Sequence, residues 1–330
     1  MSTLTAMKIL LVGATGQVGY ALAHALHAAG HDLTVLVRRD RLPFPDGVRV
    51  HSAPEFTSEV FAQALTGIDC AVYGVGLPEQ FAFDTRVFEQ VNHGLLTRFL
   101  GAVEESPLRR LVYVSTYEVF DHRGGIIREK YPLSDPAGLT PYFRAMYHAY
   151  VETLAFAERT GTRLTTIHPA ALYGGLDTGY GFTSVIENLI HRRFWRLPVV
   201  PRGRFPLIHA ESLADGIVAS LDHDGAFILS DTMCDLPTLA REVRRQAESF
   251  VPPTVPARLA YGAVWPLEQA GRAVRLRPIL SKVQLDFITA GLEPRPERAI
   301  AELDWYPMPL AEGLTRYLAG RDHLVGLRAG

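Results

Sequence analysis

The first feature with a recognisable chemistry is the glycine-rich segment Gly13-Ala-Thr-Gly16-Gln-Val-Gly19. It follows a short apolar run and precedes an Ala- and Leu-rich run of helical spacing. In a strand–turn–helix unit, such glycines allow the backbone to approach a pyrophosphate, which the positive end of the helix favours. We therefore predict a dinucleotide site; the alternative is a structural turn that binds nothing. The expected contact residues are Gly13, Thr15, Gly16, Gln17, Val18 and Gly19.

Two arginines follow the second predicted strand, which runs from Leu33 to Val37. An acidic residue at this point would accept a hydrogen bond from the ribose 2′-hydroxyl of NAD, whereas a guanidinium suits the 2′-phosphate of NADP. Here Arg38 and Arg39 come first, and the first carboxylate is that of Asp40. The sequence therefore favours NADP(H) over NAD(H) as cofactor. The alternative is that both arginines are simply solvated at the end of a strand.

These groups require elements that bring them together. Short apolar runs, typical of strands buried on both faces, alternate with helical segments. The alternation predicts an α/β fold with a doubly wound parallel (Rossmann) sheet. The predicted strands are Met7–Val12, Leu33–Val37, Val48–Val50, Cys70–Val75, Leu111–Ser115 and Leu164–His168, and the predicted helices are Val18–Ala29, Ser58–Leu65, Thr85–Val103 and Pro141–Thr160.

The regular alternation of strands and helices ends after residue 168. The chain is then predicted to be loop-rich around Gly174–Gly181 and Pro198–Pro206, with a helix over Glu211–Leu221 and a strand over Ala226–Leu229 that returns to the sheet. We predict a dinucleotide-binding domain formed by 1–168 with 205–232, and a smaller substrate-binding lobe formed by 169–204 and 233–330.

Composition excludes several classes of protein. The 330 residues are 48% hydrophobic, and 33 basic against 35 acidic residues give a net charge of −2. Balanced charge without a Lys/Arg block argues against nucleic acid as a partner, and two cysteines form no disulfide framework or metal motif. With no apolar run long enough to span a membrane and no secretory signal, we expect a cytoplasmic protein with a small-molecule partner and no metal.

Eight segments, in order, resemble the extended short-chain dehydrogenase/reductase (NAD-dependent epimerase/dehydratase) family. They are GATGQVG, VYGVG, VNHGLLTRFL, LVYVSTYEVF, TPYFRAM, IHPAALYGG, LIHAESLADGI and LDWYPMPLAEGL. The resemblance implies that Gly74 and Val75 line the ribose side of the cofactor, and that Asn92 braces the site. It also implies that Pro169 and Ala171 present backbone to the nicotinamide. His168 stands where the family has Arg, and is expected to be a buried, hydrogen-bonded histidine.

The resemblance also implies a reaction centre. Tyr142 would act as general acid/base and contact the cofactor, while Ser115 and Thr116 would bind the substrate oxygen. The family's Lys, four residues after the Tyr on the same helix face, is replaced here by Met146. Three interpretations stay open: the helix N-terminus and the cofactor's positive ring keep the phenol acidic, a proton relay serves instead, or redox chemistry is lost.

The substrate side is expected to include Glu118, Phe81 and Tyr173, with Phe81 forming part of a lid. The segment VSTYEVF is similar to the VSTDEVY of nucleotide-sugar 4,6-dehydratases, but Tyr117 occupies the Asp position, so the acid–base pair needed to eliminate water is missing. The apolar segment Val255–Leu280 resembles the 3β-hydroxysteroid dehydrogenase and dihydroflavonol reductase branches, which take hydrophobic substrates.

We therefore predict an NADP-dependent oxidoreductase that interconverts a secondary alcohol and a ketone on a hydrophobic, sterol- or triterpenoid-like substrate. One alternative is a sugar-nucleotide epimerase, with Arg202 or Arg204 holding the diphosphate. A second, of another class, is an NADP(H)-binding regulator or accessory protein with a degenerate site. The resemblance further implies a homodimer through the long helices that contain Leu95 and Leu154.

Overall fold

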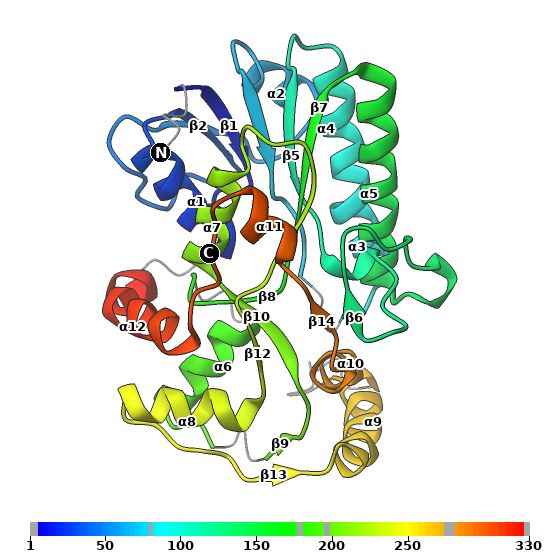
Figure 1. Ribbon diagram of the computed structural model, residues 1–330, viewed down its shortest axis with the longest axis vertical. Coiled ribbons are helices and arrows are strands. Elements are labelled where there is room, and N and C mark those ends of the chain that lie inside the picture. The colour runs from blue at the N-terminus through cyan, green and yellow to red at the C-terminus, as the bar shows by residue number, and fades with distance from the viewer. Residues whose placement is uncertain (1–5, 79–81, 177–180, 195–198, 274–280, 327–330) are drawn as a thin grey trace.

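A parallel seven-stranded sheet forms the centre of the molecule (Figure 1). The computed structural model describes residues 6–78, 82–176, 181–194, 199–273 and 281–326. The strand order is β11-β7-β5-β4-β1-β2-β3, and every neighbouring pair is parallel. All the predicted strands are present, as β1 (Lys8–Val12), β2 (Asp32–Val37), β3 (Arg49–Ser52), β4 (Cys70–Tyr73), β5 (Arg110–Val114), β7 (Arg163–Pro169) and β11 (Gly225–Leu229).

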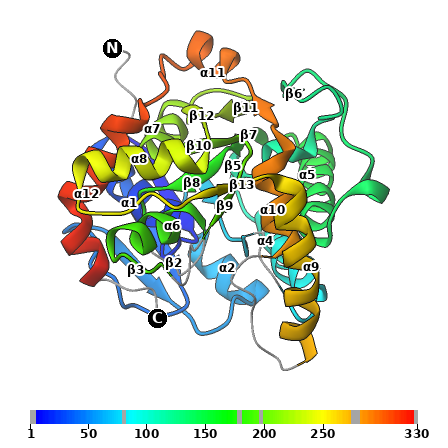
Figure 2. The same cartoon turned by 90° about the horizontal axis from the view of Figure 1, so that it is seen from below.

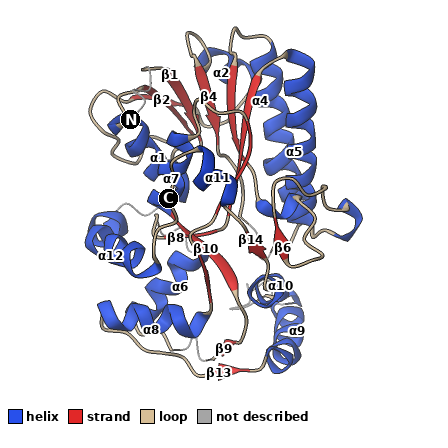
Figure 3. Ribbon diagram, in the orientation of Figure 1, coloured by secondary structure: helices blue, strands red, loops and turns tan. Residues whose placement is uncertain are grey.

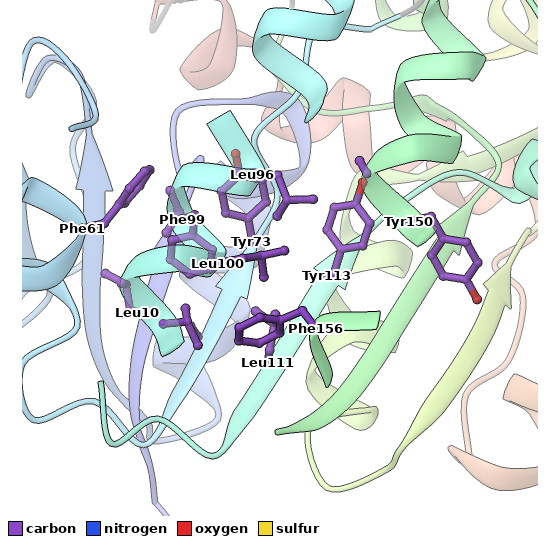
Figure 4. Packing of buried hydrophobic residues seen from close by; sticks show 14 of the residues in the cluster. Leu10, Phe61, Tyr73, Leu96, Phe99, Leu100, Leu111, Tyr113, Tyr150 and Phe156 are labelled. Atoms are coloured by element: carbon purple, nitrogen blue, oxygen red, sulfur yellow. The ribbon is translucent and has the colours of Figure 1, made fainter. Parts of the chain in front are cut away.

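Helices cover both faces of this sheet, as the doubly wound prediction requires. One face carries α1 (Gln17–Ala28), α7 (Ala210–Ala219) and α11 (Glu297–Glu302). The other carries α2 (Ser58–Ala64), α4 (Leu95–Glu104) and α5 (Pro141–Thr160), whose apolar side chains meet those of the strands (Figure 4). Tyr73 packs against Phe99 there, with ring centroids 4.9 Å apart. The predicted fold class is therefore confirmed.

The predicted helix over Thr85–Val103 contains an irregular turn. It consists of α3 (Arg86–Phe88), a π-helical segment η1 (Glu89–Gly94) and then α4. Inserted π turns are rare, and they occur frequently at functional sites. This one lies directly against α5.

A smaller lobe lies beyond the carboxyl ends of the strands, and it faces the viewer in Figure 2. Its three-stranded sheet has the order β12-β10-β8, and β8 and β10 are labelled between the large sheet and the β9–β13 pair in Figure 3. A core of its own joins this sheet to α6, α8, α10 and α12. The strands are β8 (Ala171–Tyr173), β9 (Val200–Pro201), β10 (Phe205–His209), β12 (Thr232–Cys234) and β13 (Thr254–Val255), and the helices are α6 (Gly181–Ile190), α8 (Leu236–Gln246), α9 (Ala257–Ala273), α10 (Lys282–Ala290) and α12 (Leu310–Gly326).

The two parts of the chain interleave more than the sequence predicts. Within 205–232, α7 and β11 join the large sheet, whereas β10 and β12 pair in the lobe. From the C-terminal segment, α11 packs on the large sheet, and β14 (Glu293–Pro294) pairs with β6 (Ile126–Ile127). Helix α6 begins where the first predicted loop, Gly174–Gly181, ends, and the sequence analysis predicts no helix there; it forms because Phe182, Ile186 and Leu189 make an apolar stripe that the lobe buries.

Candidate active site

The glycine turn lies where β1 ends, beside the end of β4. Gly13 has φ +102°, and a β-carbon there would lie 2.9 Å from the backbone of Gly74 and 3.1 Å from the amide nitrogen of Val75. A β-carbon at Gly19 would lie 2.1 Å from the carbonyl oxygen of Gly13. The turn therefore needs glycine at both positions, and it brings together two of the predicted cofactor segments.

The N-terminus of α1 opens onto this turn. Its N-cap residue is Gly16, which is exposed and provides no side-chain cap for the first amide groups of the helix. Those groups belong to Gln17, Val18 and Gly19, so they are available to an anion, which the helix dipole favours. Thr15 is half-buried beside them. A dinucleotide pyrophosphate fits this helix start, because its first amide groups have no side-chain cap and the glycine at the N-cap is exposed.

The loop after β4 is held by a side chain of the π-helical segment. Asn92, 1% exposed, lies in η1 and bonds the backbone of Leu77 twice. Its Oδ1 accepts from the Leu77 amide at 2.7 Å, and its Nδ2 donates to the Leu77 carbonyl at 3.1 Å. Side-chain amides are suited to this because they donate and accept at once. The pair of bonds fixes the loop that starts at Gly74 and Val75.

Arg38 and Arg39 follow β2 at the same edge of the sheet. Both side chains are exposed. Val12 and Leu36 are register partners, so the arginines lie one strand away from the glycine turn. Neither guanidinium has a carboxylate partner among the described residues. They are therefore free to bind an anionic group on the adenosine ribose.

Ser115 and Thr116 follow β5 and are both nearly buried, with 5% and 7% exposed. The Ser115 amide donates to the carbonyl of Ile167 at 2.7 Å, which ties it to β7. Ser115 lies on the same side of the strand as Tyr113, two residues before it. Burial raises the pKa of Tyr113, and the Ser115 hydroxyl beside that phenol partly opposes the shift.

His168 holds Thr116 in place, in agreement with the prediction of a buried, hydrogen-bonded histidine. It is 0% exposed, its Nδ1 lies 2.9 Å from the Thr116 carbonyl, and its Nε2 lies 2.9 Å from the Thr166 hydroxyl. Because a carbonyl only accepts, Nδ1 must donate, and the neutral ring accepts at Nε2. Burial lowers the pKa of His168 to about 4.

Tyr142 lies in the first turn of α5. Thr140 caps that helix by accepting from the Phe143 amide, and Pro141 follows at the first helical position. The half-buried phenol ring packs edge-on against Phe88, with centroids 5.8 Å apart. The lower end of α5 in Figure 1, which carries Tyr142, is the end nearest the lobe.

Met146 lies one turn further along α5 and is 6% exposed. Positions four apart share a helix face, so the thioether occupies the place that the resemblance assigns to a lysine. The chain has three lysines, at 8, 130 and 282, and no contact in the described residues brings one of them to Tyr142. The structure therefore supplies no lysine in place of the missing one.

The predicted substrate residues do not share one location in the structure. Glu118 is 7% exposed and lies in the 3-10 turn η2 (Tyr117–Val119), directly after Thr116. Tyr173 is fully buried in the core of the lobe, edge-on to His209 and against Gly313, so it offers no surface to a substrate. Phe81 lies outside the described residues.

Pro169 and Ala171 flank the passage from β7 into β8, at the carboxyl edge of the sheet. The amide of Ala170 between them donates to Leu229 at 2.8 Å. Their backbone therefore lies at the edge where the nicotinamide is expected.

Part of the segment that suggested a hydrophobic substrate, residues 274–280 with Val274, lies outside the described residues, and the apolar side chains described in the rest do not line one common pocket. Leu259 and Trp265 in α9 are 59% and 65% exposed. Val264 instead packs with Ala260 and Leu285 in a small separate core. The apolar residues thus divide between the surface and this core, which removes the argument for a sterol-like substrate.

Sequence reasoning missed the residues that join the lobe to the start of α1. The side-chain Nε2 of Gln17 donates to the Thr183 hydroxyl at 3.1 Å, and that hydroxyl oxygen also accepts from the backbone amide of Gly174 at 3.1 Å. A β-carbon at Gly175 would lie 2.7 Å from the Gln17 carbonyl. The adjacent glycines were a usable signal, since paired glycines mark close backbone approach as well as loops.

Comparisons with known proteins agree with this geometry. A family model described as the NAD dependent epimerase/dehydratase family matches residues 9–228. A search of curated protein sequences finds no match. Among the described helices, none is both long and apolar enough to cross a membrane.

Several solved structures are similar over nearly the whole chain. A nucleoside-diphosphate-sugar epimerase from Pseudomonas aeruginosa is 20% identical, with TM-score 0.76, over 98% of this chain and 100% of that one. A UDP-glucuronic acid 4-epimerase from Bacillus cereus, in complex with NAD, is 14% identical, with TM-score 0.72, over 98% and 99%. The enzyme WbmG from Bordetella bronchiseptica, in complex with NAD and UDP, is 14% identical, with TM-score 0.73, over 97% of each chain. At these identities the likeness establishes a shared fold.

Proposed function

Because the chain belongs to the NAD-dependent epimerase/dehydratase family, we propose that it is a sugar-nucleotide epimerase. The observation that carries the proposal is that its likeness to nucleotide-sugar enzymes extends over the smaller lobe as well as the large sheet. Binding sites between a sheet and a covering lobe draw residues from both. This proposal adopts the alternative from the sequence analysis in place of its main prediction, an oxidoreductase for a hydrophobic substrate, because two of the apolar side chains of α9 on which that prediction rests, Leu259 and Trp265, are exposed.

Two arginines suit the diphosphate of such a substrate. Arg202 and Arg204 are exposed on the turn between β9 and β10. The turn is fixed, because the Arg202 amide donates to the Val255 carbonyl at 3.1 Å and a β-carbon at Gly203 would lie 2.1 Å from the Ile288 carbonyl. Guanidinium groups bind phosphate oxygens in pairs. We assign the diphosphate to one or both of these side chains.

The proposed cofactor is a nicotinamide dinucleotide, with NADP(H) preferred. Gly13, Gly16 and the first amides of α1 would hold the pyrophosphate, and Asn92 would keep the β4 loop in position. The preference rests on Arg38 and Arg39, which are exposed and have no carboxylate partner in the described part of the chain. A dianionic 2′-phosphate would gain two charge-assisted contacts there.

In the proposed reaction, a bound nicotinamide supplies hydride transfer from and back to one carbinol carbon of the sugar. The phenolate oxygen of Tyr142 accepts the hydroxyl proton as the C–H bond breaks. The hydroxyl groups of Ser115 and Thr116 donate hydrogen bonds to the resulting carbonyl oxygen. Tyr142 would return the same proton to that oxygen once the alcohol is restored with the opposite configuration, so product and substrate would differ only in configuration.

Because Met146 carries no charge, we expect it to slow this reaction. An ammonium at that position would stabilise the phenolate through its charge. A buried thioether does not, so we expect proton transfer to Tyr142 to limit turnover near neutral pH and to accelerate as pH rises. The same observation supports a second candidate function, an NADP(H)-binding accessory protein with no turnover.

The test is an epimerisation assay on nucleoside-diphosphate sugars, with products separated by chromatography. Wild-type protein should convert at least one sugar to its epimer, and Tyr142→Phe should abolish conversion while NADPH affinity is retained. Tyr147→Phe, on the same helix, is the matched control and should remain active. Cofactor binding without conversion of any sugar would favour the accessory role, and unchanged activity in Tyr142→Phe would remove Tyr142 from the reaction.

A further inference from the structure

A cluster of histidine and glutamate side chains joins η1 to α5, outside the active site. Glu89 and His93 come from the π-helical segment and His148 from α5. One potential ligand atom from each lies within 4.8 Å of the other two. The His93 Nδ1 lies 2.6 Å from Glu89 Oε1, and the His148 Nδ1 lies 3.3 Å from the same oxygen. We infer that these three residues form a binding site for a divalent transition metal of the zinc class.

The donor set selects this class of ion. Two imidazoles and one carboxylate suit Zn²⁺ and similar metals, whereas Mg²⁺ and Ca²⁺ require mostly oxygen ligands. Glu89 Oε1 lies 2.6 Å from His93 Nδ1 and 3.3 Å from His148 Nδ1, so the three donor atoms already face one another.

A second carboxylate orients one of the histidine ligands. The His93 Nε2 lies 2.7 Å from Glu152 Oε2, and that oxygen also accepts from the Thr97 hydroxyl at 2.6 Å. Nε2 must therefore donate, which leaves Nδ1 to coordinate the ion once its proton is released. Carboxylate–histidine–metal arrangements of this kind fix the ring and increase its basicity.

The site is accessible to an ion. The side chains of Glu89, His148 and His93 are 49%, 40% and 25% exposed. Water can therefore enter with the metal and complete a four-coordinate shell. Sequence motifs do not reveal such a site, because His93 and His148 are 55 residues apart and a helix pairing brings them together.

A metal here would connect the two elements that position the active site. Phe88, next to Glu89, packs on the Tyr142 ring, and Asn92, next to His93, holds the β4 loop. The ion would thus fix η1 against α5. This role is independent of the proposed reaction, and it is measured without substrate or cofactor.

The experiment is calorimetric titration of the chelator-treated, full-length protein with Zn²⁺, together with Co²⁺ absorption spectra. Wild-type protein should bind one equivalent, and Co²⁺ should give the intense visible bands of a low-coordinate site with nitrogen ligands. Glu89→Gln and the double variant His93→Ala/His148→Ala should lose that equivalent. His51→Ala, in β3, is the control and should keep it.

Glu152→Gln distinguishes a built site from an accidental one, because loss of an orienting carboxylate typically weakens metal binding about 10- to 100-fold without removing a ligand. Circular dichroism of each metal-free variant identifies any that fails to fold. We expect Glu89→Gln to fold, because the Glu89 side chain is exposed and Gln has nearly the same shape. The inference is overturned if wild-type protein binds no Zn²⁺, or if Glu89→Gln binds it as tightly as wild type.

Discussion

The buried histidine of the active site should make the protein sensitive to acid. His168 is 0% exposed and uses both ring nitrogens, and its pKa is lowered by burial from 6.5 to about 4. A group whose pKa is lower in the folded state stabilises the fold above its unfolded pKa, and this contribution is lost as pH falls through the folded value. The sensitive window therefore runs from about pH 6.5 down to about pH 4.

The size of the effect follows from these two pKa values. Because one pKa unit corresponds to about 1.36 kcal/mol, protonation of His168 alone removes about 1 kcal/mol of unfolding free energy near pH 5.5 and about 3 kcal/mol near pH 4, relative to pH 8. Those losses are a large part of the roughly 5–15 kcal/mol typical of a folded domain. Burial also lowers the pKa of His209 to about 4, so His209 adds to the loss of unfolding free energy as pH falls.

His168→Asn isolates the contribution of one ring. The Asn amide can still donate to the Thr116 carbonyl, but it does not titrate. Urea unfolding at several pH values should give a variant that is about 1–3 kcal/mol less stable than wild type near pH 8, because the Thr166 hydroxyl loses its partner and a cavity remains. The difference should shrink toward pH 4. A difference that stays constant over this range would refute the assignment of a neutral, buried imidazole.

Three further predictions concern the cofactor turn and the reaction. Arg38→Ala should weaken NADPH binding about 10- to 100-fold, the loss expected for one charge-assisted hydrogen bond, and NADH binding by much less, in fluorescence titrations that use Arg41→Ala as control; equal losses for both cofactors would contradict the 2′-phosphate assignment. Gly19→Ala places a β-carbon 2.1 Å from the Gly13 carbonyl, so it should cost about 1–3 kcal/mol in urea unfolding and weaken cofactor binding; an unchanged midpoint would show that the turn can relax. Met146→Lys should raise turnover several-fold near neutral pH and flatten its rise toward alkaline pH, and an unchanged pH–rate profile would mean that proton transfer does not limit the rate.

The large sheet is predictable because its signals are local. Strands β1, β4 and β5 are mostly apolar runs buried on both faces, and each has a turn or helix signal on either side. The signal for the start of α5 is also local, because Thr140 is a favourable N-cap residue and Pro141 is favourable at the first helical position. The positions of residues at strand ends, such as Ser115 and Gly74, can then be predicted, because the carboxyl ends of parallel strands lie at the same edge of the sheet.

The features that the sequence does not predict depend mostly on contacts between distant parts of the chain. Tyr173 is buried because α12, 140 residues later, places Gly313 against its hydroxyl. The π turn over Glu89–Gly94 has no sequence signature that separates it from an ordinary helical turn. The apolar residues of α9 favour a hydrophobic substrate in the sequence analysis, because hydrophobicity alone does not distinguish an exposed residue such as Trp265 from one that lines a pocket.

The interleaving of the sheet and the lobe limits how this protein can be engineered. The chain leaves the sheet after β7, returns for α7 and β11, and then crosses again to reach α11. Neither half is a contiguous stretch of sequence, so a lobe cannot be exchanged between relatives by a single splice. New specificity would instead have to be introduced through side chains in the crossings, such as the Gly174–Gly175 passage that rests on Gln17.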